Sequence, residues 1–174
     1  MPPTHIKHHH QNKLEETATY KLFIPALKGR LSVVSLTSGG IVKIDWKAWT
    51  PQVYEALTGV NGVKAVERVK ENVKLVNELS TSRPEPPLLV VSTLLVPGYV
   101  TIEEVEHIAE FLANVNPNIP YVLLAFYPKH LMSDLPTTSR EHAFKAYEVA
   151  RNAGLKEVFI GNVWLLSNSY TVKT

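Results

Sequence analysis

The sequence predicts an α/β protein in which parallel strands alternate with helices. The apolar, β-branched run from Leu88 to Val96 is typical of a strand that is covered on both faces. After it, Thr101 stands three residues before Glu104, which predicts a capping box at the start of a helix. The same order of strand and helix recurs on both sides of this unit. We therefore expect neighbouring strands to be parallel and joined by right-handed crossovers.

Local patterns predict the other elements in chain order. A strand is expected over Ile41–Trp46, and a short helix then begins at Pro51, with Thr50 as its N-cap, and closes at Gly59. Apolar residues recur every three or four positions in a longer helix over Gly62–Leu79. A strand is expected over Tyr121–Tyr127, and a second capping box, Thr138 and Glu141, begins the next helix. The predicted inner face of this helix comprises Ala143, Phe144, Tyr147 and Ala150. Gly154 ends the helix, and a last strand is expected over Glu157–Val163.

The N-terminal part of the chain has a different pattern. Residues 1–19 are polar, so we expect a disordered tail, and then a single α/β domain over residues 20–174. The tail contains a histidine cluster that could bind a metal, although a flexible tail is the favoured interpretation because no carboxylate or cysteine completes a ligand set. Two short strands are expected, Tyr20–Ala26 and Leu31–Thr37, with the second antiparallel to the strand that begins at Ile41. The histidine cluster in the tail comprises His5, His8, His9 and His10.

Composition excludes several classes of function. The net charge is only +2 and the lysines are dispersed, so we expect neither a nucleic-acid partner nor a membrane surface. No apolar run is long enough to span a bilayer and no signal peptide is apparent, so we expect a cytoplasmic protein. The sequence has no cysteine, which excludes disulfides, cysteine-type zinc sites and thiolate-held iron–sulfur clusters in this chain.

Four predicted parallel strands cannot close a barrel, so the sheet is either open or part of a barrel that something else completes. In both cases the candidate functional residues lie at the carboxyl ends of the strands. These ends comprise Asp45 and Lys47, Thr93 to Gly98, Tyr127 to His130, and Gly161 with Asn162.

Each of these candidates has a functional and a structural interpretation. Asp45 and Lys47 are two residues apart in an extended segment, so they share a face and form either a ligand site or an internal ion pair. Gly98, after Pro97, allows either close approach of a ligand or a simple turn. His130 is a possible acid or base, but an exposed role is favoured. His107 and His142 are expected to face solvent, and no nucleophile elbow, P-loop or dinucleotide fingerprint is present.

Taken together, the strand ends resemble the C-terminal half of radical S-adenosylmethionine (SAM) enzymes. The resemblance is greatest to pyruvate formate-lyase-activating enzymes and their relatives, and it extends from Ile41 to Val163 in the same order and with similar spacing. It is carried by the segments IDWKAWTPQVYEALTG, VKENVKLVNEL, VSTLLVPGYVTIEEVEHIAEFL, YVLLAFYP and ARNAGLKEVFIGNV.

This resemblance implies a partial (β/α) TIM-like barrel, with SAM and a [4Fe-4S] cluster as cofactors. In such oxidoreductases the cluster, held by a Cys-x-x-x-Cys-x-x-Cys loop, cleaves SAM to a 5′-deoxyadenosyl radical, which often acts on a glycine of a protein substrate. By resemblance, Asp45 and Lys47 match the methionine-side and cation region of the cofactor site. The implied cofactor-binding set also includes Thr93, Pro97 and Gly98 on the cavity wall, Tyr127 where relatives often carry a histidine, and Asn162 at the last strand end.

Two departures from the family change the expected function. The chain has no cysteine for the cluster, and residues 1–40 do not resemble the first strand–helix units of the barrel. We therefore expect a fragment, or a truncated or degenerate relative, that is not catalytically competent alone and has a complementing N-terminal half or a homodimer as partner. The alternative is a non-catalytic interaction module that dimerises or completes a partner's barrel. A third hypothesis is an enzyme that uses Asp45, Lys47 and His130 for acid–base chemistry.

Overall fold

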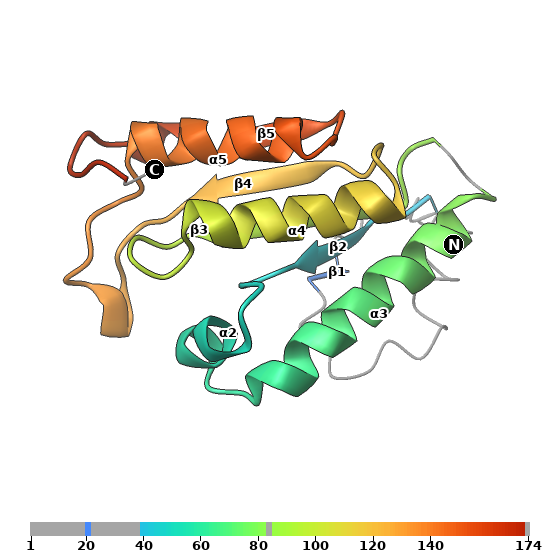
Figure 1. Cartoon of the computed structure of the whole chain (residues 1–174), viewed down its shortest axis with the longest axis horizontal. Coiled ribbons are helices and arrows are strands. Elements are labelled where there is room, and N and C mark those ends of the chain that lie inside the picture. Colours follow the sequence, from blue (N-terminus) through green and yellow to red (C-terminus); the bar gives the residue numbers. More distant parts are fainter. Residues whose placement is uncertain (1–19, 22–38, 83–84, 173–174) are drawn as a thin grey trace, which may run out of the picture.

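The computed structural model describes residues 20–21, 39–82 and 85–172 and shows one parallel sheet with helices between its strands (Figure 1). The strands lie side by side in the order β1-β2-β3-β4-β5, and every adjacent pair is parallel. Their bounds are β1 (Tyr20–Lys21), β2 (Val42–Asp45), β3 (Leu89–Leu95), β4 (Tyr121–Ala125) and β5 (Val158–Gly161). The helices are α2 (Pro51–Thr58), α3 (Gly62–Ser80), α4 (Ile102–Val115) and α5 (Arg140–Asn152), with 3₁₀ turns η1 (His130–Met132) and η2 (Val163–Leu165).

The two faces of the sheet have different environments. Because the strands follow chain order, every crossover steps in the same direction, and right-handed crossovers then place the helices on one face. In Figure 1, α3, α4 and α5 lie together on one side of the strands. Strand residues alternate accordingly: Val42, Ile44 and Val91 are buried under the helices. The opposite side, which we call the second face, carries the partly exposed side chains of Lys43, Asp45, Val90, Leu94, Val122 and Leu124 and the exposed Phe159.

The structure confirms the predicted alternation of parallel strands and helices. Strands β2 to β5 are shorter than predicted by one or two residues at one or both ends. Helix α2 begins at Pro51 and ends at Thr58, and the next residue, Gly59, has a φ of 72°, the left-handed conformation that glycine adopts without strain. Helix α4 begins after Thr101, whose hydroxyl accepts a hydrogen bond from the Glu104 backbone N–H (3.4 Å). Whether the sheet belongs to a barrel stays a prediction.

The prediction for α5 was wrong in two respects. The N-cap is Ser139, not Thr138, and its hydroxyl accepts from the His142 N–H (3.1 Å). Thr138 instead ties two strand ends together, because its hydroxyl donates to the Leu95 carbonyl and accepts from the Phe126 N–H, both at 2.7 Å. The predicted inner face also included Phe144, which is 54% exposed. The buried residues on this face are the small Ala143, Ala146 and Ala150, together with His142.

His142 is not at the surface, contrary to the sequence prediction. Its side chain is only 2% exposed, and its Nδ1 lies 2.8 Å from the Tyr170 hydroxyl in the C-terminal segment. Within the described residues its Nε2 has no hydrogen-bond partner. Burial lowers the pKa of His142, and the Val100 backbone offsets this only in part. His107, by contrast, is exposed as predicted and lies 3.5 Å from the Glu110 carboxylate.

Several predictions concern residues outside those described. Of the predicted strand Tyr20–Ala26, the structure describes Tyr20 and Lys21, which pair in parallel with β2 through Tyr20 and Val42. The predicted strand Leu31–Thr37 and the tail of residues 1–19, with its histidine cluster, lie outside the described residues. No helix in the described part of the chain is both long and apolar enough to cross a membrane.

Candidate functional site

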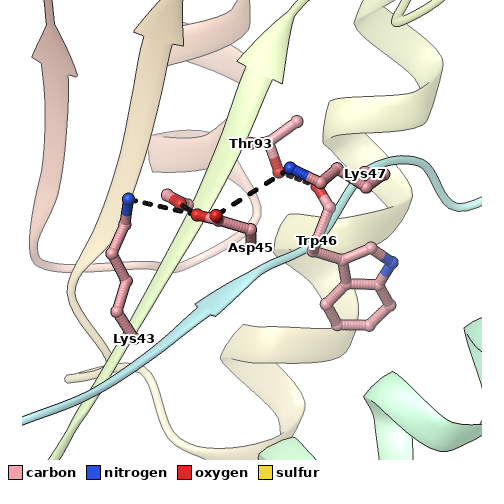
Figure 2. A network of polar contacts seen from close by, with 6 residues as sticks. Lys43, Asp45, Trp46, Lys47 and Thr93 are labelled. Atoms are coloured by element: carbon pink, nitrogen blue, oxygen red, sulfur yellow. Dashed lines mark hydrogen bonds and ion pairs between the residues drawn. The ribbon is translucent and has the colours of Figure 1, made fainter. Parts of the chain in front are cut away.

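A compact polar cluster lies on the second face at the carboxyl end of β2 (Figure 2). Its centre is the Asp45 carboxylate. Oδ1 lies 3.1 Å from Lys43 Nζ and accepts a hydrogen bond from the Ser92 hydroxyl, and Oδ2 lies 3.8 Å from Lys47 Nζ. Lys43 and Lys47 approach Asp45 from opposite sides, and the Trp46 indole points away from the cluster. We call these four residues (Lys43, Asp45, Lys47 and Ser92) the Asp45 cluster.

Strand geometry explains why these side chains meet. Residues 43, 45 and 47 alternate with the buried Val42, Ile44 and Trp46, so they all project to the second face. Ser92 joins them because it is the register partner of Asp45 on β3. The sequence predicted that Asp45 and Lys47 share a face, and the structure confirms it. Lys43 could have been found from the same alternation, whereas Ser92 requires knowledge of the strand register.

Electrostatics keep Asp45 ionised. Partial burial raises the pKa of its carboxyl, but the Ser92 hydrogen bond and the two lysines together outweigh burial and hold the pKa below its ordinary value. With both lysines protonated, the cluster carries two positive charges and one negative charge. The Oδ1 atom already has two close donors, whereas Oδ2 has only the longer contact with Lys47. Oδ2 and the Lys47 ammonium are therefore the groups best able to bind a ligand that carries both charges.

Thr93 lies beside this cluster in sequence but projects to the other face of the sheet. It is buried, and its hydroxyl donates to the Trp46 carbonyl (2.9 Å) and accepts from the Tyr121 hydroxyl (2.9 Å). Burial raises the pKa of Tyr121, so its hydroxyl stays protonated. The Thr93 hydroxyl thus forms hydrogen bonds within the core between β2, β3 and β4, and it does not face the Asp45 cluster.

The turn after β3 contains Pro97 and Gly98. Gly98 has a φ of 78°, and a Cβ added there would meet nothing within 4 Å. A glycine is therefore favoured at this position by the left-handed backbone conformation and not by close packing around it. Pro97 is buried and Gly98 is exposed, and the turn is closed by a hydrogen bond from the Val100 N–H to the Val96 carbonyl (3.0 Å).

The remaining candidates lie at the same edge of the sheet but away from Asp45. Tyr127 is exposed after β4, with Lys129 Nζ 5.8 Å from its ring centre. Asn162 follows β5 in the left-handed conformation (φ 55°), and its side chain donates to the Ala125 carbonyl (3.4 Å). Strands β4 and β5 are two and three positions from β2. His130 also follows β4, two strands from Asp45 and Lys47, so the structure does not bring these three side chains together for acid–base chemistry.

The described residues do not fit an iron–sulfur cluster or another metal centre. They contain no group of three or more histidine, cysteine, aspartate or glutamate side chains that could hold a metal ion. The complete sequence has no cysteine, so the thiolates that hold a [4Fe-4S] cluster cannot come from this chain. The Asp45 cluster, by contrast, suits the charged groups of a small organic ligand.

The sequence matches no model of a known protein family and no curated protein. The assignment of a function therefore depends on the strand-end residues and their geometry.

Proposed function

We propose that this chain is the C-terminal part of a radical SAM-type barrel, related to glycyl-radical-enzyme activases, and that it supplies one wall of a SAM site without performing radical chemistry alone. The observation that carries the proposal is the Asp45 cluster, which lies at the carboxyl end of a parallel strand on the second face. Functional groups occupy this position in βα barrels.

The topology supports a barrel segment. In a βα barrel the strands follow chain order, the helices form the outer layer, and the other face of the sheet lines the interior. The described strands also follow chain order, and their helices lie on one face. The second face would then line the interior, and its partly exposed apolar residues would be covered when the barrel is completed.

The chemistry of the cluster suits the amino-acid end of SAM, which carries an α-ammonium and an α-carboxylate. Asp45 would accept from the ammonium through Oδ2, and Lys47 would donate to the carboxylate. Lys43 and Ser92 hold the opposite carboxylate oxygen and so orient Asp45. Reductive cleavage of SAM needs a cluster that this chain cannot hold, so these residues bind and orient but do not complete a reaction.

Calorimetric titration with SAM tests the binding role. We expect weak binding that Asp45→Asn and Lys47→Met each reduce about tenfold, because each removes one charged contact worth about 1–2 kcal/mol. Matched controls are Asp134→Asn and Lys64→Met, two exposed positions with no ion pair among the described residues. Equal affinities for all five proteins, or no binding by the wild-type chain, would contradict the proposal.

Anaerobic reconstitution with iron and sulfide tests the catalytic part of the proposal separately. We expect no stoichiometric brown cluster and no 5′-deoxyadenosine from SAM, because the thiolate ligands are missing. A stoichiometric cluster with SAM cleavage would show that the chain is a complete enzyme.

A second candidate is an interaction module that dimerises or completes a partner's barrel. The observation in its favour is the second face, where Val90, Leu94, Val122 and Leu124 are partly exposed and Phe159 is exposed beside them on β5. Apolar surface of this kind is a typical association site. Light scattering should show a dimer that Phe159→Asp dissociates, whereas a monomer at all concentrations would exclude self-association.

A further inference from the structure

The Glu104 side chain makes a contact that the sequence did not predict. In the predicted capping box its carboxylate would return to the Thr101 N–H. Instead, Oε2 accepts from the backbone N–H groups of Trp49 (2.5 Å) and Thr50 (3.0 Å), which lie in the loop after β2. Glu104 is only 6% exposed, and Trp49 and Thr50 are half-buried, so this contact between two βα units is partly shielded from water. A buried carboxylate that accepts backbone hydrogen bonds is a strong and specific anchor.

The loop that Glu104 holds directly follows the Asp45 cluster. On the side of β3, the Trp46 N–H donates to the Ser92 carbonyl (2.8 Å) and the Trp46 carbonyl accepts from Thr93 (2.9 Å). The Trp46 indole N–H then donates to the Ala48 carbonyl (2.9 Å). Lys47 thus lies between an anchor at Trp46 and an anchor at Trp49. Trp46 and Ala48 are fully buried, which directs Lys47 to the opposite side, with Asp45.

We infer that Glu104 is a positioning residue for the ligand-binding pair Asp45 and Lys47. Its carboxylate fixes the backbone on the C-terminal side of Lys47, so the ammonium is held near Asp45 before a ligand arrives. The inference rests on the proposed function in so far as that ligand is SAM. A pre-positioned ammonium binds more tightly because less side-chain and loop freedom is lost on binding.

A purely structural role is the competing explanation. Thr50 is the N-cap of α2, it makes no side-chain capping bond, and the first turn of α2 has no acidic residue. The Glu104 carboxylate therefore also serves the N-terminus of α2, where a negative charge is favourable. If this were its whole role, its loss would lower thermal stability but leave the affinity of the folded protein for SAM unchanged.

The test compares Glu104→Gln with Glu106→Gln. Glu106 lies on the same helix, is exposed, and makes no side-chain hydrogen bond or ion pair with the described residues. The glutamine at 104 loses the charge, and with its amide oxygen at the Oε2 position its NH2 group replaces Oε1 and faces the Thr50 N–H, which donates to Oε1 at 3.3 Å in the wild type. Two quantities are measured well below the melting temperature: SAM affinity by calorimetry, and hydrogen exchange of the backbone amides of residues 45–50. We expect Glu104→Gln to weaken SAM binding about tenfold and to speed exchange at Trp49 and Thr50, with no change in Glu106→Gln.

Each outcome decides the inference. Faster exchange with unchanged SAM affinity overturns it and leaves the proposed function intact. If the wild-type chain does not bind SAM, the proposed function fails, and the inference, which concerns its ligand-binding pair, fails with it. If Glu104→Gln does not fold, Thr50→Pro removes one of the two donors instead, at a φ of −74° that proline tolerates. It should weaken SAM binding, and unchanged affinity would overturn the inference.

Discussion

The carboxyl end of β2 and the carboxyl ends of β4 and β5 lie on the same edge of one sheet, yet they are built differently. After β2, the charged side chains contact one another and the backbone is anchored by β3 and α4. After β4 and β5, the large side chains are mostly exposed, as at Tyr127, Leu131 and Trp164. A position at the end of a parallel strand is therefore insufficient for a site. The β2 end is distinguished by a cross-strand partner, Ser92, and an anchor from the next helix, Glu104.

The largest difference between the two regions is expected for their tryptophans. Trp46 is 0% exposed and Trp164 is 78% exposed. Trp46→Ala should lower the free energy of unfolding by about 3–5 kcal/mol, because it removes a fully buried aromatic and leaves a cavity. Trp164→Ala should change it by less than about 0.5 kcal/mol. Urea denaturation of both variants makes the comparison, and similar losses would show that the β5 end is packed more tightly than the structure indicates.

The connection between the strand ends is tested at Thr138. Thr138→Val removes a buried hydroxyl and leaves the Leu95 carbonyl and the Phe126 N–H without this partner. We expect a loss of about 1–3 kcal/mol in the free energy of unfolding. Thr137→Val, one residue earlier and less buried, is the matched control and should cost less than about 0.5 kcal/mol. An equal effect of the two variants would mean that the strand ends do not depend on this hydroxyl.

The pH dependence of stability is expected to report on His142. Burial lowers its pKa in the folded chain, so the unfolded chain binds more protons near its ordinary pKa of 6.5. The stability that the neutral ring contributes is fully present above about pH 6.5 and is lost as the pH falls toward the lower folded pKa, by at most about 1.4 kcal/mol per pH unit. His142→Gln should flatten the dependence of the unfolding free energy on pH between pH 7 and 5. An unchanged slope in His142→Gln would assign the dependence to other groups.

The smallest effect is expected at Lys43, one of the two partly exposed lysines of the Asp45 cluster. Lys43→Met should change the free energy of unfolding by only about 0–1 kcal/mol, because a partly exposed ion pair contributes little. Its effect on SAM affinity should be larger, since Asp45 loses a donor that orients it. Stability and affinity are measured on the same variant. A large loss of stability with unchanged affinity would make Lys43 a structural residue.

The sequence predicted the elements well because their signals are local. Pro51, Gly59 and Thr101 each mark a helix end through backbone chemistry that depends on few neighbours. The errors occurred where tertiary contacts compete with local ones. The Glu104 carboxylate binds the loop after β2 and not the Thr101 N–H. The Thr138 hydroxyl bonds to two strand ends and does not cap α5. His142 is buried because the small alanines of α5 allow this helix to pack closely.

The candidate site was predictable only in part, for the same reason. Alternation along β2 is enough to bring Asp45 and Lys47 to one face. The same alternation sends Thr93 into the core, but only the register between β2 and β3 shows that its neighbour Ser92 is the partner of Asp45. Long-range contacts of this kind leave no pattern in a single sequence.

The most direct test of SAM binding by the Asp45 cluster is an NMR titration of the wild-type chain with SAM, monitored through the backbone amides. We expect the largest chemical-shift changes at Lys43, Lys47 and Ser92, and we expect Asp45→Asn to abolish them. SAM binding at this cluster would be contradicted if SAM caused no changes, or if the largest changes occurred around Lys129 and Trp164 and persisted in Asp45→Asn.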